Sequence, residues 1–207
     1  MSVQRTLNRT CSVSVPKLPT SGFLVVDVET TGLNPNSRIV EIAWVHVSLR
    51  GVIGHSFSTL LSAGGSSGTW SAKRVHGIRD VDLQDAPKFA KIASGLTKSL
   101  QGKILVAHNA KFDVGRINYE LRRIRKPHLK SFACTLEMGI ELGLGRLSLS
   151  KAVEQFRLRH KNPHHAVDDA LATAQLLRKF LFLDRQGVLE YLDNKRARCL
   201  GRTPAIS

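Results

Sequence analysis

The sequence predicts a mixed α/β fold in which helices pack against a single sheet. Residues 23–33 begin as an apolar, β-branched run that is long enough for a buried strand, and the run breaks at a glycine. A tight turn at residues 50–51 joins two further apolar segments, which makes them antiparallel neighbours. After residue 85, segments with helical periodicity alternate with short apolar strands. Three strands followed by this alternation are typical of a mixed sheet covered by helices.

The other elements follow from the spacing of apolar residues and from turn-forming residues. Besides the first strand, we expect strands at residues 38–47, 52–60, 103–107 and near 132–134. We expect helices at residues 85–100, 110–124, 136–142, 148–156 and 163–183, with one more before a basic tail at 195–198. Residues 62–69 are rich in Gly and Ser and are expected to form a mobile loop.

Charge distinguishes this chain from an ordinary globular protein. Its hydrophobic content of 42% is typical, but its net charge is +15 and its pI is near 10.4. Such a balance favours polyanionic partners, which are nucleic acid or an anionic membrane surface. No apolar run approaches the length of a membrane-spanning helix. The basic cluster at residues 122–130 is a candidate surface for binding phosphates.

The first residues and the cysteines bear on the cellular compartment. Residues 1–20 carry three basic residues and no acid, and they lack the apolar core of a secretory signal. A basic, flexible leader is expected there, with a presequence as the weaker alternative. The three cysteines are far apart and form no Cys-x-x-Cys pair, which argues against a disulfide framework. These features fit a reducing compartment, and we predict a cytoplasmic location.

Two carboxylates, Asp27 and Glu29, lie inside the first strand and are separated by one residue. Strand side chains alternate between faces, so both point the same way. Such a pair on a buried strand is self-repelling and costly to desolvate unless a cation neutralises it. An early end to the strand, with both acids solvated, is the alternative. Because Val25, Val26 and Val28 continue the strand through the pair, we favour a site for a divalent metal such as Mg²⁺ or Mn²⁺.

More acids are expected to complete this site, since two carboxylates rarely suffice. Asp113 lies on or beside the apolar stripe of its helix, although an acid in a first turn also simply favours the helix dipole. In the long helix near the C-terminus, Asp169 shares the core-facing stripe with Thr173 and Leu177, whereas Asp168 lies on a solvent-facing stripe. We therefore assign Asp169 to the site and Asp168 to the surface.

A histidine near these acids is a candidate general base. His164 precedes Asp169 by five residues, behind the helix start that Pro163 predicts. The pKa of histidine is close to neutrality, which suits proton transfer beside a metal–carboxylate cluster. A surface histidine in a basic patch is the alternative for any one of the eight histidines. A zinc site formed by His160, His164 and His165 is a third interpretation, but it lacks thiolates and convergent spacing.

Four segments together resemble a known family. They are Val-Asp-Val-Glu-Thr-Thr-Gly-Leu at 26–33, Val-His-Gly-Ile at 75–78, Ala-His-Asn-Ala-Lys-Phe-Asp at 107–113 and His-His-Ala-Val-Asp-Asp-Ala at 164–170. In this order and at these separations, they resemble the DEDDh 3′–5′ exonuclease family. Within it the chain is most similar to the branch of RNase T and the proofreading epsilon subunit of bacterial DNA polymerase III. The resemblance covers about residues 22–183.

The resemblance implies a ribonuclease-H-like fold with a five-stranded mixed sheet flanked by helices. It also implies that two Mg²⁺ or Mn²⁺ ions are held by four carboxylates, which are Asp27, Glu29, Asp113 and Asp169. The general base would be His164, which takes a proton from water as a nucleoside monophosphate is released from a 3′ end. Further residues would contact the terminal nucleotide or line the cleft, namely Thr30, Thr31, Leu33, His76, His108 and Asn109.

We therefore expect a metal-dependent DNA 3′–5′ exonuclease with a proofreading-like or repair-like role. An RNA exonuclease of the RNase T or oligoribonuclease type is the alternative, and a non-catalytic nucleic-acid-binding protein is an alternative of another class. Nucleic acid is the expected partner, a polymerase or replication partner is left open, and no membrane partner is expected. The predicted organisation is a leader at 1–20, an exonuclease domain at 21–183 and a short helical, basic tail at 184–207.

Overall fold

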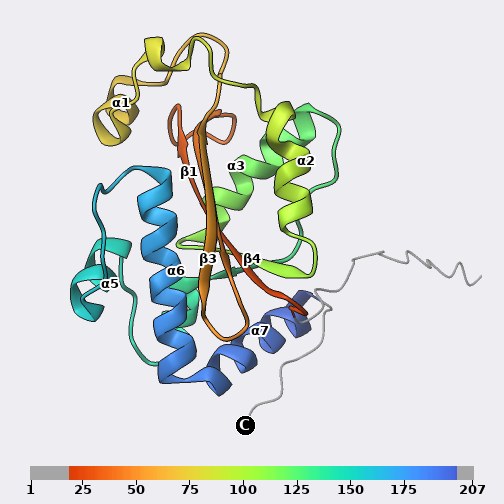
Figure 1. Cartoon of the computed structure of the whole chain (residues 1–207), viewed down its shortest axis with the longest axis vertical. Coiled ribbons are helices and arrows are strands. Elements are labelled where there is room, and N and C mark those ends of the chain that lie inside the picture. Colours follow the sequence, from red (N-terminus) through yellow and green to blue (C-terminus); the bar gives the residue numbers. More distant parts are fainter. Residues whose placement is uncertain (1–18, 200–207) are drawn as a thin grey trace, which may run out of the picture.

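The centre of the fold is a five-stranded mixed sheet, seen in a computed structural model that describes residues 19–199 (Figure 1). The strands lie in the order β3-β2-β1-β4-β5. β1 pairs antiparallel with β2 and parallel with β4, β2 pairs antiparallel with β3, and β4 pairs parallel with β5. Their bounds are β1 (Gly22–Thr30), β2 (Ile39–Val47), β3 (Ile53–Leu60), β4 (Lys103–Ala107) and β5 (Phe132–Cys134). The predicted strands are all present.

Helices cover both faces of this sheet, with α6 on one face and α2 and α3 on the other (Figure 1). The helices are α1 (Trp70–His76), α2 (Phe89–Ser99), α3 (Ala110–Arg123), α4 (Thr135–Glu141), α5 (Leu149–Phe156), α6 (Ala166–Leu183) and α7 (Arg185–Cys199). A short 3₁₀ helix, η1, spans Asp80–Leu83. The predicted mixed sheet flanked by helices is confirmed.

Alternation along β1 divides the core into two halves. Phe23 and Val25 are buried with the side chains of α6 and α7, and Leu24, Val26 and Val28 are buried with those of α2 and α3. β1 is thus apolar on both faces, which explains its nearly continuous run of Val and Leu. A charged side chain within such a strand is therefore desolvated, whichever face it lies on.

Two helices begin later than the sequence predicts. α2 begins at Phe89 and not at residue 85, because the residue before a proline is disfavoured in a helix. The carbonyl of Pro87 instead accepts a hydrogen bond from the N–H of Ser62 at 3.0 Å. α6 begins at Ala166 and not at Pro163, because His164 has a left-handed backbone with φ +67°. Neither α1 nor η1 was expected; the apolar residues Trp70 and Val75 of α1 are exposed and do not form a buried stripe.

The last helix, α7, lies under the end of the sheet and belongs to the same core (Figure 1). Its side chains Val188, Tyr191 and Leu192 are buried in this core. The hydroxyl of Tyr191 accepts a hydrogen bond from the N–H of Cys134 in β5 at 2.9 Å, which ties α7 to an edge strand. The predicted leader and the end of the predicted tail, at 1–18 and 200–207, lie outside the described residues.

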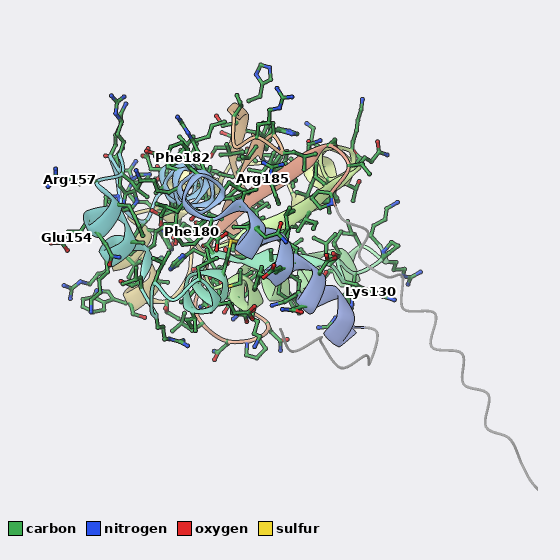
Figure 2. All side chains as sticks on the ribbon, turned by 90° about the horizontal axis from the view of Figure 1, so that it is seen from below. Lys130, Glu154, Arg157, Phe180, Phe182 and Arg185 are labelled. Carbon is green, nitrogen blue, oxygen red and sulfur yellow. The ribbon has the colours of Figure 1, made fainter. Side chains whose placement is uncertain are left out.

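The junction of α6 and α7 shows how sharply exposure changes within one turn. Seen from below, Phe180 and Phe182 lie near each other on α6, with Arg185 at the start of α7 (Figure 2). Phe180 is 1% exposed and packs edge-on against Phe156, whereas Phe182 is 84% exposed.

Among residues 19–199, no helix combines the length and the apolar character that crossing a membrane requires.

Candidate active site

Asp27 and Glu29 of β1 line a cleft of about 330 Å³ at the end of that strand. Asp27 and Glu29 point to the same side of β1, as the two-residue period requires. The cleft is lined by Asp27, Val28, Glu29, Thr30, Gly32, Leu33, Ser71, Ala72, Val75, His76, His108, Asn109, Phe112, Asp113 and Asp169. These residues come from β1, α1, the start of α3 and the start of α6, so segments far apart in the sequence meet here.

Two acids reach this cleft from the first turns of helices. Asn109, which precedes α3, has a left-handed backbone with φ +62°, and the turn brings Asp113 against β1. Asp113 is only 3% exposed, which agrees with the expected position on the buried stripe. Asp169 is 9% exposed and lies in the first turn of α6. Asp169 is the more buried of the two adjacent aspartates and lines the cleft, whereas Asp168 is half-buried, and not fully on the surface as expected, and accepts a hydrogen bond from Asn162.

A fifth acid, Glu41, fixes the start of α6 to the sheet. It lies on β2 directly opposite Glu29 and is 8% exposed. Its Oε2 accepts a hydrogen bond from the N–H of Ala166 at 3.1 Å, and its Oε1 accepts one from the hydroxyl of Ser58 at 3.2 Å. The first N–H groups of a helix have no partner within the helix, so this carboxylate satisfies one of them. Asp169 lies three residues after Ala166 in the same helical turn, so the hydrogen bond between Glu41 and Ala166 also positions Asp169.

Asp169 itself is held by two donors. Nε2 of His160 forms a short hydrogen bond with Oδ1 of Asp169. The backbone N–H of His164 donates to Oδ2 at 3.3 Å. The side chain of His164 is exposed, yet one of its ring nitrogens and one oxygen each of Glu29 and Asp169 lie within 4.8 Å of one another. Among the described residues, these three form the group whose ligand atoms are close enough to share a metal ion.

The electrostatics of the cleft disfavour several ionised carboxylates at once. Burial raises the pKa of Asp27 well above its usual range, and the charges of Asp113, Asp169, Glu29 and Glu41 add to the increase. Burial raises the pKa of Glu29 to about 8, with further repulsion from Asp169, Glu41 and Asp113. Burial also raises the pKa of Asp113 to about 7, although backbone hydrogen bonds oppose the change. A divalent cation with oxygen ligands would relieve this repulsion, so the donor set fits Mg²⁺ or Mn²⁺.

Five of the six residues expected to contact substrate line the cleft: Thr30, Leu33, His76, His108 and Asn109. Leu33 projects outward and is 84% exposed. The sixth, Thr31, is not among the lining residues, because its polar atoms serve the loop that follows β1. Its Oγ1 accepts from the N–H of Arg38 at 3.0 Å, and its carbonyl accepts from the N–H of Thr69 at 2.9 Å.

Two histidines of the cleft are held in defined tautomers by their neighbours. Nδ1 of His76 accepts from the N–H of Ile78 at 3.0 Å, so the proton of the neutral ring is on Nε2. Nε2 of His108 lies 3.1 Å from the carbonyl of Leu147 and donates to it, while Nδ1 lies 2.9 Å from the hydroxyl of Thr135. Burial lowers the pKa of both rings. Each is therefore expected to be neutral and to stabilise the wall of the cleft.

The wall formed by α1 is attached to the end of β1. Thr69 caps α1 through a hydrogen bond from the N–H of Ala72 to its hydroxyl, at 3.3 Å. The preceding residue, Gly68, has φ +133°, and a Cβ added there would lie 2.5 Å from the carbonyl oxygen of Thr31. Gly68 therefore permits the close approach of this wall to β1. This contact, together with the backbone bond between Thr31 and Thr69, fixes the width of the cleft.

The sequence did not reveal two polar residues of the site and part of the wall formed by α1. Glu41 carried a signal, because it is the one acid in a largely apolar strand. His160 carried little, because it lies in a basic segment and was considered only as a zinc ligand. In the structure its Nε2 contacts Asp169, and His165 is exposed at the start of α6, so the described residues give no support to a three-histidine zinc site. Ser71 and Ala72 were missed because α1 was not expected, although His76 on the same helix was among the predicted cleft residues.

The sheet order and the helices on both faces, with buried acids at the end of β1, correspond to the ribonuclease-H-like fold. The family model for exonucleases of the RNase T type matches residues 24–177. This is more than half of the chain, so the chain belongs to this exonuclease family. The family is divalent-metal dependent, and the hydrolytic activity expected from the sequence is confirmed at this level.

Known relatives agree with this placement. The chain is 34% identical over 166 residues to the DNA polymerase III epsilon subunit of Buchnera aphidicola from Acyrthosiphon pisum, covering 74% of this chain and 70% of that protein. It is 31% identical over 188 residues to the 3′–5′ exonuclease DinG of Bacillus subtilis, covering 87% of this chain but 19% of that protein. The predicted resemblance to the epsilon-like branch is thereby confirmed.

Solved structures share the fold. Exonuclease X in complex with 5′-overhanging duplex DNA matches with a TM-score of 0.65 and 26% identity, covering 83% of this chain and 98% of that one. The nuclease domain of 3′hExo, a DEDDh family member bound to rAMP, matches with a TM-score of 0.68 and 16% identity, covering 78% and 92%. The second likeness supports the fold alone.

Proposed function

We propose that this exonuclease removes nucleotides from DNA 3′ ends, using two divalent ions held by Asp27, Glu29, Asp113 and Asp169. The observation that supports this most directly is the convergence of these four acids, from three separate elements, in one cleft. The raised pKa values of Asp27, Glu29 and Asp113 mean that ionised carboxylates are unfavourable here without a cation to neutralise them. Two such ions would stabilise the attacking and leaving oxygens of the phosphodiester.

His164 is the proposed general base. Its side chain is exposed to solvent and lies beside Glu29 and Asp169, so it can take a proton from water at the edge of the acid cluster. The left-handed backbone at His164 places the residue outside α6 and keeps the ring free of helical packing. His108, by contrast, has both ring nitrogens engaged and is not placed to move a proton.

The apolar walls are proposed to hold the terminal base. Leu33 and Val75 are both large, apolar and more than half exposed, and they line the same cleft as Phe112. When a flat base stacks on exposed apolar side chains, it removes their surface from water, and this burial favours binding of the base. Thr30 follows Glu29 in β1 and lines the same cleft, and it is proposed to contact the sugar.

DNA is the proposed substrate because two relatives point to it. The Buchnera relative is named for a DNA polymerase, and the Exonuclease X structure contains duplex DNA. An RNA substrate is the second candidate, since the 3′hExo structure holds rAMP. By the same reasoning a polymerase partner is a proposal, drawn from the name of the epsilon relatives.

Degradation of end-labelled substrates tests the function. We expect stepwise shortening from the 3′ end of single-stranded DNA and of 3′-mismatched duplex in Mg²⁺, release of nucleoside monophosphates, and no reaction with chelator. A matched RNA strand should react more slowly. Faster cleavage of RNA would contradict the DNA assignment but not the exonuclease, whereas binding without turnover of any substrate would support the non-catalytic alternative.

A further inference from the structure

The loop between α5 and α6, residues 157–165, is fastened to α6 on both sides of His160. On one side, Oε1 of Gln175 accepts from the N–H of Arg159 at 3.0 Å and Nε2 of Gln175 donates to the carbonyl of Arg159 at 2.9 Å. On the other side, Nδ2 of Asn162 donates to Oδ2 of Asp168 at 2.9 Å. The backbone around His160 is therefore fixed relative to the helix that carries the acids.

Between these two attachments, His160 turns inward onto Asp169. Its side chain is 7% exposed, and its Nε2 hydrogen-bonds Oδ1 of Asp169. An ionised carboxylate can only accept, so Nε2 is the donor. Oδ2 of Asp169 receives the backbone N–H of His164. Each oxygen thus has one protein donor and still has lone pairs available for a cation.

We propose that His160 is a positioning residue, which orients the Asp169 carboxylate for metal binding and holds in place the loop that carries His164. This inference rests on the proposed function, in which Asp169 is a metal ligand and His164 the general base. A hydrogen bond to a ligating carboxylate fixes its rotamer, and losing such a bond typically weakens metal binding by about 10-fold to 100-fold. The donor nitrogen of His160 is occupied by this bond, so His160 acts through Asp169.

One side chain thereby serves two parts of the site. His160 and His164 are separated by three residues of the same loop, and both contact Asp169, one through its ring and the other through its backbone. If the ring of His160 is removed, the loop loses its buried attachment to Asp169 while the attachments of Arg159 and Asn162 remain. We expect a looser carboxylate and a displaced His164 in a protein that still folds.

Manganese binding measured by electron paramagnetic resonance tests this inference without relying on turnover. In His160→Ala, we expect Mn²⁺ affinity to fall by about 10-fold or more, with a loss in kcat and little change in KM for DNA. His160→Gln, whose amide can donate from nearly the same place as Nε2, should recover most of the affinity. His165→Ala removes an exposed histidine from the same loop and should behave as the wild type.

Unchanged Mn²⁺ affinity in a folded His160→Ala would overturn the inference. If that variant does not fold, His160→Met fills a similar volume without a donor, and equal Mn²⁺ affinities of His160→Met and His160→Gln would overturn it instead. Asp169→Asn separates this failure from that of the proposed function. If Asp169→Asn binds Mn²⁺ like the wild type, the metal assignment fails; if only the His160 variants do so, the metal assignment stands and the role of His160 is wrong.

Discussion

Glu29 has to be charged to hold a cation, yet it lies where charge is costly. Its pKa is raised from 4.5 to about 8 in the folded protein. The unfolded chain gives up this proton near 4.5, so the folded state binds an extra proton between these values. Stability of the metal-free protein must therefore fall as pH rises through this interval. Each pKa unit corresponds to roughly 1.4 kcal/mol, so this fall in stability should be large enough to measure.

We predict that Glu29→Gln removes part of this fall in stability, because the raised pKa values of Asp27 and Asp113 also contribute to it. Thermal unfolding in chelator at pH values of about 5 and 8 measures it, because the wild type should lose stability at the higher pH while the variant loses less. Mg²⁺ at the higher pH should restore the wild type and have little effect on the variant. Glu154→Gln changes an exposed glutamate of α5 (Figure 2) and should leave the fall intact. A wild type that is equally stable at both pH values would contradict the prediction.

Two pairs of adjacent residues in the segment 164–170 give a second prediction at the scale of residues. Asp169→Asn and His164→Ala should each lower the rate by about a hundredfold or more, as the loss of a metal ligand or a general base does. Asp168→Asn and His165→Ala should change it far less, because an asparagine at 168 keeps an oxygen that can accept from Asn162 and the side chain of His165 is exposed.

Single-turnover hydrolysis of one labelled DNA by the four variants makes this comparison. Circular dichroism must first show that each variant is folded. If Asp168→Asn is inactive while Asp169→Asn retains activity, the assignment of the inward-facing aspartate is wrong.

At the scale of elements, the start of α6 depends on β2. Glu41→Ala leaves the buried N–H of Ala166 without an acceptor, which costs about 1–3 kcal/mol. Glu41→Gln removes the same charge but keeps an oxygen that can accept. We therefore predict that the alanine variant melts at a lower temperature than the glutamine variant and also has the lower kcat, because Asp169 lies in the turn that Glu41 fixes. Equal melting temperatures would show that this bond does not anchor the helix.

The elements also show what the sequence could and could not reveal. Apolar periodicity located all five strands and most helices, because burial on a known face leaves a pattern in the sequence. It missed α1, whose apolar residues Trp70 and Val75 are largely exposed and so follow no buried stripe. It placed the start of α6 too early, because a left-handed residue at His164 and a partner on β2 are tertiary features. The four acids were found because charge in an apolar pattern is conspicuous, whereas His160 lay among other basic residues.

At the scale of the whole molecule, the net charge of +15 predicts steep salt dependence of DNA binding. Charge-removing changes at Arg122, Arg123 and Arg125, near the end of α3, should flatten the slope of log affinity against log salt by about 0.9 for each DNA phosphate that the variant no longer neutralises. Fluorescence anisotropy between about 50 and 200 mM salt measures this slope. The same number of charges removed around α5, at Arg146, Lys151 and Arg157, should change it less. An unchanged slope would remove the α3 cluster from the binding surface.

The close approach at Gly68 also limits which sequences this cleft tolerates. Any side chain there would press on the carbonyl of Thr31, in a backbone conformation that L-residues rarely adopt. Ser66, two residues earlier in the loop, is exposed. If both positions are randomised and survivors are selected for nuclease activity, sequencing should recover many residues at 66 and almost only glycine at 68. Frequent alanine at 68 would mean that the α1 wall can retreat without loss of function. Almost only glycine at 68 would mean that the contact with β1 restricts this position of the loop more than its exposed neighbour.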